Sequence, residues 1–238
     1  MIEIRNLTKK YGDFTAVDDI SLSVSPGEIY GFLGPNGAGK TTTIRILAGL
    51  SLPTSGVVRI AGVDITSDGS RTKSIIGYIP DRPYLYEKLT GRELLQFVVN
   101  LYGREWPDCE PRALELLEYF DIADWKDARI ENLSHGMKQK LVIVAALVHD
   151  PSVLVIDEPM VGLDALAQKQ VKTLLRRLAA EQKTIFLTTH TMSVAEAVCD
   201  RIGILHRGKI IASGTTAELK SNRALEDVFL ELTYDASS

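Results

Sequence analysis

The chain has 238 residues and a formal net charge of −4, and this length suits one α/β domain with a small appended lobe. The acidic balance argues against a general nucleic-acid-binding protein, so we expect no nucleic acid among its partners. The longest apolar run, residues 141–148, is shorter than the roughly 20 residues of a membrane-spanning helix, so any role at a membrane requires a partner. Cys109 and Cys199 lie far apart without metal-ligand spacing, which indicates reduced thiols in a cytoplasmic protein.

The N-terminal part of the chain predicts strands and turns, and its first residues are typical of a strand rather than a signal peptide. Strands are expected at 20–24 and 28–33, with a turn between them. A glycine-rich loop then leads into an expected helix at 40–50. Two more strands are expected at 57–60 and 75–79.

The middle of the chain changes to helical periodicity, which predicts a helical lobe over about residues 81–150, inserted into an α/β core. The clearest helices in it are expected at 92–102 and 111–120. Beyond the lobe, strands and helices alternate, as in a mainly parallel sheet; the strands are expected at 153–156, 184–187 and 202–205, and the helices at 164–180 and 192–199.

The glycine-rich loop matches the phosphate-binding pattern G-x-x-x-x-G-K-[ST] completely; its residues are Gly34, Pro35, Asn36, Gly37, Ala38, Gly39, Lys40 and Thr41, followed by Thr42. Glycines let the backbone curl so that successive N–H groups point at phosphate oxygens, and the following helix adds the positive end of its dipole. Lys40 would reach the β- and γ-phosphates, and the Thr41 hydroxyl would hold Mg²⁺. The alternative, a turn that binds nothing, does not account for the full pattern between a strand and an apolar helix.

Two carboxylates end an apolar run at residues 153–156, which is expected to be a strand covered on both faces. In open parallel sheets the carboxyl ends of the strands are where ligands bind. Asp157 would hold Mg²⁺ directly or through water, and Glu158 would orient or deprotonate the attacking water as a general base. A solvated turn after the strand is the alternative, and the phosphate loop upstream argues against it.

Together these residues resemble the ATP-binding cassette (ABC) family, and further motifs lie in that family's order. The sequence LSHGM at 133–137 is similar to the family signature LSGGQ, and GLD at 162–164 to the loop that crosses the dimer interface. His190 matches the switch histidine that contacts the γ-phosphate, and Tyr11 the aromatic residue that stacks on adenine. In the family, ATP lies between the phosphate loop of one subunit and the signature of another, which implies nucleotide contacts from Ser134, Gly136 and Asp164.

The resemblance implies a phosphate-loop NTPase fold with a mainly parallel sheet, an N-terminal antiparallel β region and the inserted helical lobe. Residues 1–238 would form a single nucleotide-binding domain with a C-terminal helical extension over about 215–238. ATP and Mg²⁺ are the implied cofactors. The implied partners are a second ABC ATPase subunit and an integral membrane permease, which would hold the chain at the inner face of the cell membrane.

Two positions depart from the family pattern. Asp81 stands where the family usually has a glutamine that ligates Mg²⁺; a carboxylate can serve directly or through water, or Asp81 is only a loop residue. His135 and Met137 replace a glycine and the glutamine of the signature. We expect His135 to point outward, which preserves the anion-binding helix start that Ser134 caps.

Other segments bear on the branch of the family. An aromatic stretch at 84–93 lies where ABC proteins meet the permease, although packing inside the lobe accounts for it equally well. Residues 215–218 predict a capping box, followed by an apolar stripe that we expect to pack on the chain's own core; the stripe is Leu225, Val228, Phe229 and Leu232. The sequences at 136–139 and 225–232 are similar to those of bacterial ATPases that serve export permeases for drugs, antibiotics or polysaccharides.

These observations favour an ATPase that powers a separate export permease through ATP-driven dimer closure. ABC ATPases of translation resemble two cassettes in one chain, and this chain has one. Chromosome and DNA-repair ATPases carry a long coiled coil between phosphate loop and signature, and no sustained heptads occur here. A regulatory module with weak or no hydrolysis stays open because of Asp81 and His135, whereas Glu158 and His190 argue against it.

Overall fold

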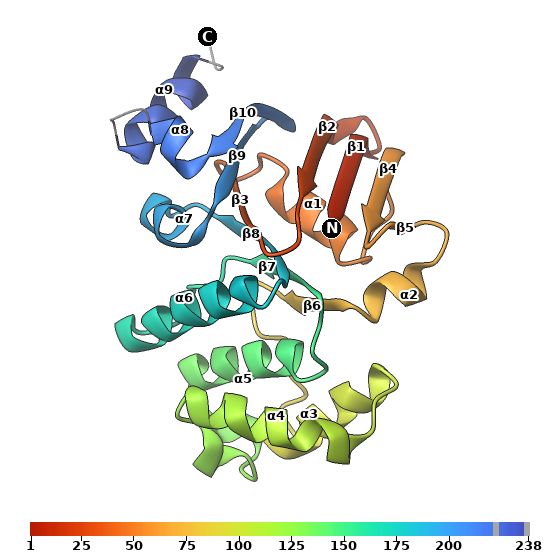
Figure 1. Ribbon diagram of the computed structural model, residues 1–238, viewed down its shortest axis with the longest axis vertical. Coiled ribbons are helices and arrows are strands. Elements are labelled where there is room, and N and C mark those ends of the chain that lie inside the picture. The colour runs from red at the N-terminus through yellow and green to blue at the C-terminus, as the bar shows by residue number, and fades with distance from the viewer. Residues whose placement is uncertain (221–223, 236–238) are drawn as a thin grey trace.

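The α/β core contains two sheets, and the first is antiparallel throughout. The computed structural model describes residues 1–220 and 224–235, with side chains up to residue 231 (Figure 1). The N-terminal sheet has the strand order β2-β1-β4-β5. Its strands are β1 (Ile2–Tyr11), β2 (Phe14–Val24), β4 (Ser55–Ile60) and β5 (Val63–Asp64). The predicted antiparallel region is therefore confirmed.

The second sheet is mainly parallel, with the order β10-β9-β3-β8-β7-β6. Its strands are β3 (Ile29–Leu33), β6 (Ile76–Ile79), β7 (Val153–Asp157), β8 (Thr184–Thr189), β9 (Arg201–His206) and β10 (Lys209–Thr215). Every residue of β3, β7 and β8 is buried, as expected of strands covered on both faces. Among the strands of this sheet that the structure describes, β10 alone pairs antiparallel, and the sequence analysis did not predict it.

Helices cover this sheet and position the loops at its edge. The helix α1 (Lys40–Leu47) follows β3 after the phosphate loop and ends three residues before its predicted end. A short helix, α2 (Gly69–Lys73), precedes β6. The helices α6 (Ala165–Ala180) and α7 (Met192–Val198) confirm the predicted alternation with β7, β8 and β9.

The helical lobe consists of α3 (Gly91–Leu101), α4 (Trp106–Tyr119) and α5 (His135–Leu147), with short 3₁₀ turns at Ala123–Trp125 and Ile130–Asn132. It forms the end of the molecule opposite the N-terminal sheet (Figure 1). The predicted start of α4 was wrong by five residues. Pro107 occupies its first turn, where a missing N–H costs nothing, so Pro111 lies inside the helix rather than at its start.

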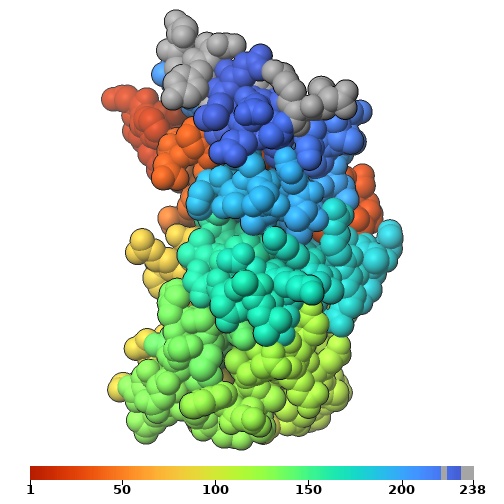
Figure 2. Space-filling view, turned by 90° about the vertical axis from the view of Figure 1, so that its left-hand side faces the viewer, coloured from red at the N-terminus to blue at the C-terminus, as the bar shows by residue number. Residues whose placement is uncertain are grey.

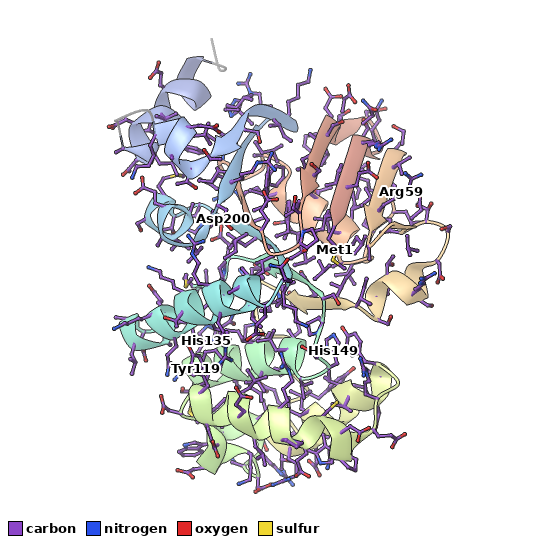
Figure 3. The ribbon with its side chains drawn as sticks, in the orientation of Figure 1. Met1, Arg59, Tyr119, His135, His149 and Asp200 are labelled. Carbon is purple, nitrogen blue, oxygen red and sulfur yellow. The ribbon has the colours of Figure 1, made fainter. Side chains whose placement is uncertain are left out.

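Among the polar contacts that join the lobe to the core, two use aromatic side chains and backbone carbonyls. At one, the Tyr102 hydroxyl and His149 Nε2 both hydrogen-bond the Ile76 carbonyl oxygen, at 3.1 and 3.2 Å, and their rings stack with centroids 3.5 Å apart. At the other, the Tyr119 hydroxyl donates to the Gln170 carbonyl and the Gln170 amide donates to the Tyr119 carbonyl, both at 2.8 Å. Figure 3 shows Tyr119 and His149 on the side of the lobe that faces the core.

The C-terminal elements pack beside β9 and β10. Thr215 and Glu218 form the predicted capping box, with the Thr215 N–H donating to Glu218 at 2.8 Å, and α8 (Thr216–Lys220) follows. In α9 (Leu225–Asp235), Leu225 and Val228 are buried and Phe229 packs against the core, which confirms that part of the stripe. The Leu232 side chain lies outside the described residues. Figure 2 shows α6 between the helical lobe and these C-terminal elements. Within residues 1–220 and 224–235, no helix combines the length and the apolar character needed to cross a bilayer.

Candidate nucleotide-binding site

A cavity of about 370 Å³ opens at the carboxyl ends of the parallel strands. It brings together residues from four separate segments of the chain that the sequence analysis selected: the phosphate loop, the loop after β6, the end of β7 and the end of β8. Phe14 and Ala16 of β2 line it as well. The full lining is Phe14, Ala16, Asn36, Gly37, Gly39, Lys40, Thr41, Thr42, Asp81, Asp157, Glu158 and His190.

The phosphate loop surrounds a buried ammonium group. Lys40 Nζ donates to the carbonyl oxygens of Gly34, at 2.6 Å, and Pro35, at 3.0 Å. Burial lowers the pKa of Lys40, and the nearby carboxylates of Glu158 and Asp157 oppose this shift. The N-cap residue of α1 is Gly39, which has no side chain to cap the helix. The first N–H groups of α1 are therefore free to bind an anion.

Asp157 forms the acidic floor of the cavity. It is 3% exposed and accepts a hydrogen bond of 2.5 Å from the Thr188 hydroxyl. Burial raises the pKa of Asp157, the Thr188 hydrogen bond lowers it, and the negative charges of Asp81 and Glu158 raise it further. Asp81 is exposed at the cavity rim. A cation in this cavity would relieve the repulsion among these carboxylates.

The donor set fits Mg²⁺ only together with a bound phosphate. In the part of the chain that the structure describes, no three His, Cys, Asp or Glu side chains are grouped so that they could hold a metal alone. Thr41 and Asp157 nevertheless face one cavity with Lys40, and both offer oxygen atoms. Mg²⁺ is usually bound in this way, by one or two protein oxygens plus phosphate oxygens and water.

Glu158 and His190 form a pair at the cavity. His190 Nδ1 lies 2.7 Å from Glu158 Oε1, and because an ionised carboxylate only accepts, the imidazole donates. The Glu158 side chain is 16% exposed and that of His190 is 62% exposed. Glu158 has a φ of 53°, which is uncommon for a residue with a side chain and which turns the chain sharply after β7. Such backbone conformations cluster at functional sites.

The structure places Tyr11 outside this cavity. Tyr11 is 49% exposed, and Lys9 Nζ lies over its ring, 4.9 Å from the centroid. Its cross-strand partner Phe14 lines the cavity instead. The sequence analysis missed Phe14, although an aromatic residue directly across the hairpin turn from Tyr11 was a usable signal. Adenine stacking by Tyr11 therefore stays a prediction, and Phe14 is a second candidate.

Three other predicted contacts lie away from the cavity of their own chain. Ser134 accepts a hydrogen bond of 3.2 Å from the Met137 N–H and so caps α5, as predicted. Asp164 accepts one of 2.8 Å from the Ala167 N–H and caps α6. Gly136 lies in the first turn of α5. These residues therefore belong to surfaces other than the cavity that contains Lys40.

His135 is exposed and packs against the loop that precedes α6. A methyl group added at Gly162 would lie 2.5 Å from His135 Nε2, and Gly162 has a φ of 76°. Figure 3 places His135 and His149 at opposite ends of α5. His135 does not line the cavity of its own chain, and its orientation toward a second chain stays a prediction.

The aromatic stretch after Asp81 contributes to an open groove of about 290 Å³ between β6, α3 and α5. Tyr84 is 82% exposed and Tyr86 is 62% exposed, whereas Leu85 packs against the core. The Tyr86 and Phe97 rings meet edge to face, with centroids 5.5 Å apart. The two tyrosines thus lie on the surface of the lobe rather than in its interior.

Comparison with known proteins gives a consistent result. A model of the ABC transporter family matches residues 17–161. The chain is 36% identical to the Escherichia coli protein named "Probable multidrug ABC transporter ATP-binding protein YbhF" over 99% of this chain, which spans only 42% of that protein. It is 39% identical to the linearmycin resistance ATP-binding protein LnrL of Bacillus subtilis, over 98% of this chain and 75% of LnrL.

Solved structures share the fold over nearly the whole chain. The ATP-binding subunit of an ABC transporter superposes with a TM-score of 0.93 and 33% identity, covering 98% of this chain and 99% of that one. The ATP-binding cassette MJ0796, solved as a dimer in a post-hydrolysis state with ADP and Pi, gives a TM-score of 0.81 and 27% identity, covering 90% and 98%. The predicted fold class is confirmed.

Proposed function

Because the chain belongs to the ABC transporter family, we propose that it binds ATP with Mg²⁺ and hydrolyses it to drive a membrane partner. One observation carries this proposal. The Glu158–His190 pair lies at the same cavity as the buried Lys40 ammonium and the Asp157 carboxylate. A phosphate-binding loop, a metal-binding carboxylate and a general base are thereby combined in one place, which is the set that phosphoryl transfer to water requires.

The cavity residues have separate roles in the proposed reaction. Lys40 and the free N–H groups of α1 hold the phosphates, and Lys40 exchanges its bonds to loop carbonyls for bonds to phosphate oxygens. Thr41 and Asp157 would hold Mg²⁺, which when bound neutralises charge on the phosphates. Asp81, at the rim, is placed to ligate that ion through water. Glu158 takes the proton of the attacking water, and a His190 imidazolium, which donates from both ring nitrogens, would bond Glu158 through Nδ1 and the γ-phosphate through Nε2.

A second subunit completes the site in this proposal. Ser134, Gly136 and Asp164 lie outside their own chain's cavity, and Ser134 and Gly136 lie at the start of α5, a position that favours an anion. A twofold arrangement would bring them to the nucleotide held by the other chain. The dimeric state of the MJ0796 cassette supports this arrangement. The chain would thus act as one cassette over residues 1–238, paired with a copy of itself or with a related subunit.

The membrane partner would dock at the groove that carries Tyr84 and Tyr86. Exposed aromatic residues beside Asp81 give a permease both an apolar surface and a direct path to the cavity. The names of YbhF and LnrL connect those proteins to multidrug transport and to linearmycin resistance. We therefore assign the chain to an export system, held at the cytoplasmic face of the membrane by its permease.

The test is Mg²⁺-dependent phosphate release by the purified chain, alone and co-expressed with the membrane protein encoded beside it. Glu158→Gln should abolish release while ATP stays bound and a dimer accumulates in gel filtration, since the amide keeps the shape but accepts no proton. Glu115→Gln, at a surface glutamate of α4 paired with Arg177, is the matched control and should keep wild-type activity. Equal ATP binding and equal, negligible turnover in all three proteins would instead favour the regulatory module.

A further inference from the structure

The phosphate loop is supported from behind by the β9–β10 hairpin. Arg207 and Gly208 form its two-residue turn, with φ values of 47° and 81°. The Gly208 N–H donates to the Ala38 carbonyl at 2.9 Å, and the Gly208 carbonyl accepts from the Asp18 N–H at 2.8 Å. One buried glycine therefore bridges β2 and the phosphate loop through its own backbone.

The backbone of the phosphate loop lies close against neighbouring carbonyl groups. Side chains added at Gly34 and Gly39 would collide with the carbonyl oxygens of Leu205 and Ala16, respectively. Next to the turn, Lys209 of β10 forms an ion pair with Asp18 of β2, with Nζ 3.3 Å from Oδ2. The end of β9, the hairpin turn and the first part of β2 thus form one surface on which the phosphate loop rests.

The hydrogen bond from Gly208 fixes the direction of a phosphate-binding group. The peptide between Ala38 and Gly39 is planar and trans, so its carbonyl and its N–H point in opposite directions. Because the Ala38 carbonyl is held by Gly208 behind the loop, the Gly39 N–H points away from the hairpin, and Gly39 lines the cavity. Phosphate affinity depends on several such N–H groups converging on one anion.

We propose that Gly208 is a positioning residue for nucleotide binding, acting through the Ala38–Gly39 peptide of the phosphate loop. This inference rests on the proposed ATP-binding function and extends it to a turn that no motif marks. A methyl group at Gly208 would lie 3.2 Å from the Ala16 carbonyl oxygen and 3.3 Å from the Asp18 nitrogen. Contacts this short require the hairpin or β2 to give by a few tenths of an ångström, which would weaken the hydrogen bond that holds the Ala38 carbonyl.

The chain contains a matched control. The β4–β5 hairpin also has a two-residue turn with a glycine in second place, where Ala61 and Gly62 have φ values of 52° and 79°. A methyl group at Gly62 would meet nothing within 4 Å, and Gly62 is exposed. Gly62→Ala and Gly208→Ala therefore impose the same backbone strain, and only Gly208→Ala disturbs the phosphate loop.

The experiment measures the dissociation constant of a fluorescent ATP analogue with Mg²⁺, together with KM, kcat and the melting temperature, for wild type and both variants. We expect Gly208→Ala to weaken binding about tenfold and to raise KM more than it lowers kcat, because the catalytic pair is untouched. Gly62→Ala should lower the melting temperature similarly and leave the dissociation constant unchanged. Gly208→Asn, which adopts positive φ more easily, serves in the same comparison if Gly208→Ala does not fold.

Failure of the positioning role and failure of the proposed ATP binding give different results. Equal dissociation constants for wild type and the Gly208 variant, with the melting temperature lowered as in Gly62→Ala, would overturn the positioning role and leave ATP binding intact. Failure of the wild-type chain itself to bind the analogue would instead overturn the proposed function on which the inference rests.

Discussion

The α/β core and the helical lobe contribute unequally to the nucleotide site. The core, with the loop after β6, supplies every residue that lines the cavity, from Phe14 to His190. The lobe supplies Ser134 and Gly136, and they lie elsewhere, at the start of α5. Under the proposed function, this difference means that the cavity of one chain would bind the phosphates, whereas the lobe would offer the start of α5 to the nucleotide of another chain. Experiments that separate the two regions test this division directly.

The largest expected effect comes from Lys40→Ala in the core. Removing the buried ammonium should weaken MgATP binding roughly a hundredfold, because charge-assisted bonds to phosphate are lost. Ser134→Ala in the lobe should leave binding to the isolated chain unchanged and lower turnover. In mixed dimers, the intact phosphate loop of the Ser134→Ala chain would face the intact signature of the Lys40→Ala chain, so activity should rise when the two impaired variants are mixed.

Phosphate release from the mixture, compared with each variant alone, measures this rescue. Lys183→Ala is the control for the loss of a lysine, since Lys183 pairs with Asp150 away from the cavity. A mixture that releases no more phosphate than the two variants do separately, although gel filtration shows mixed dimers, would mean that Ser134 does not serve the partner's nucleotide.

The second prediction concerns the Tyr102–His149 connection that holds the lobe to the core. Burial lowers the pKa of His149 to about 4, with Arg104 and Arg112 lowering it and the Ile76 carbonyl and Asp150 raising it. The folded protein therefore binds fewer protons than the unfolded chain between about pH 4 and the ordinary value of 6.5. This contribution to stability is complete above pH 6.5 and is lost as the pH falls toward 4.

Urea unfolding at pH 7.5 and pH 4.5 measures the loss. His149→Phe keeps a ring for stacking on Tyr102 and has no titratable group. Going from pH 7.5 to pH 4.5 should lower the free energy of unfolding of the wild type by roughly 2 kcal/mol more than that of the variant. Equal losses in the two proteins would show that His149 is not the group that couples lobe attachment to pH.

The third prediction concerns the contact between the signature and the loop before α6. Gly162→Ala combines strain at positive φ with a clash against His135, whereas in a His135→Ala background only the strain remains. A double-mutant cycle of unfolding free energies should therefore give a coupling of about 1–2 kcal/mol. Additive effects would mean that the ring does not rest on Gly162, and the signature would then be independent of this loop.

The sequence predicted the parallel sheet better than the elements at its edge. The strands β3, β7 and β8 are continuous apolar runs, and such runs leave few alternatives. The strand β10 escaped prediction because its residues are mostly half-buried, without the alternation that marks an amphipathic strand. The start of α4 was placed five residues late, at Pro111, whereas the helix begins at Trp106 with Pro107 in its first turn.

Within the site, residues fixed by local sequence were placed more readily than those fixed by tertiary contacts. Lys40 belongs to the phosphate loop after β3, Asp157 is the last residue of β7 and Glu158 follows it, so the buried strands determine where these residues lie. Gly208 supports the loop from a distant hairpin, and no local pattern connects it with Ala38. Tyr11 and Phe14 show the same limit, because the geometry of a hairpin turn decides which aromatic residue faces the cavity.

The smallest expected effect distinguishes these two aromatic residues at the edge of the core. Phe14 lines the cavity, so Phe14→Ala should weaken binding of the ATP analogue about fivefold, which corresponds to about 1 kcal/mol of lost ring stacking. Tyr11→Ala should weaken binding less, since the Tyr11 ring contacts Lys9 and does not line the cavity. Binding of inorganic triphosphate, which has no base, is the control and should not change in either variant. A larger loss for Tyr11→Ala would show that the β1–β2 turn rearranges around the base and would retain Tyr11 as the stacking residue.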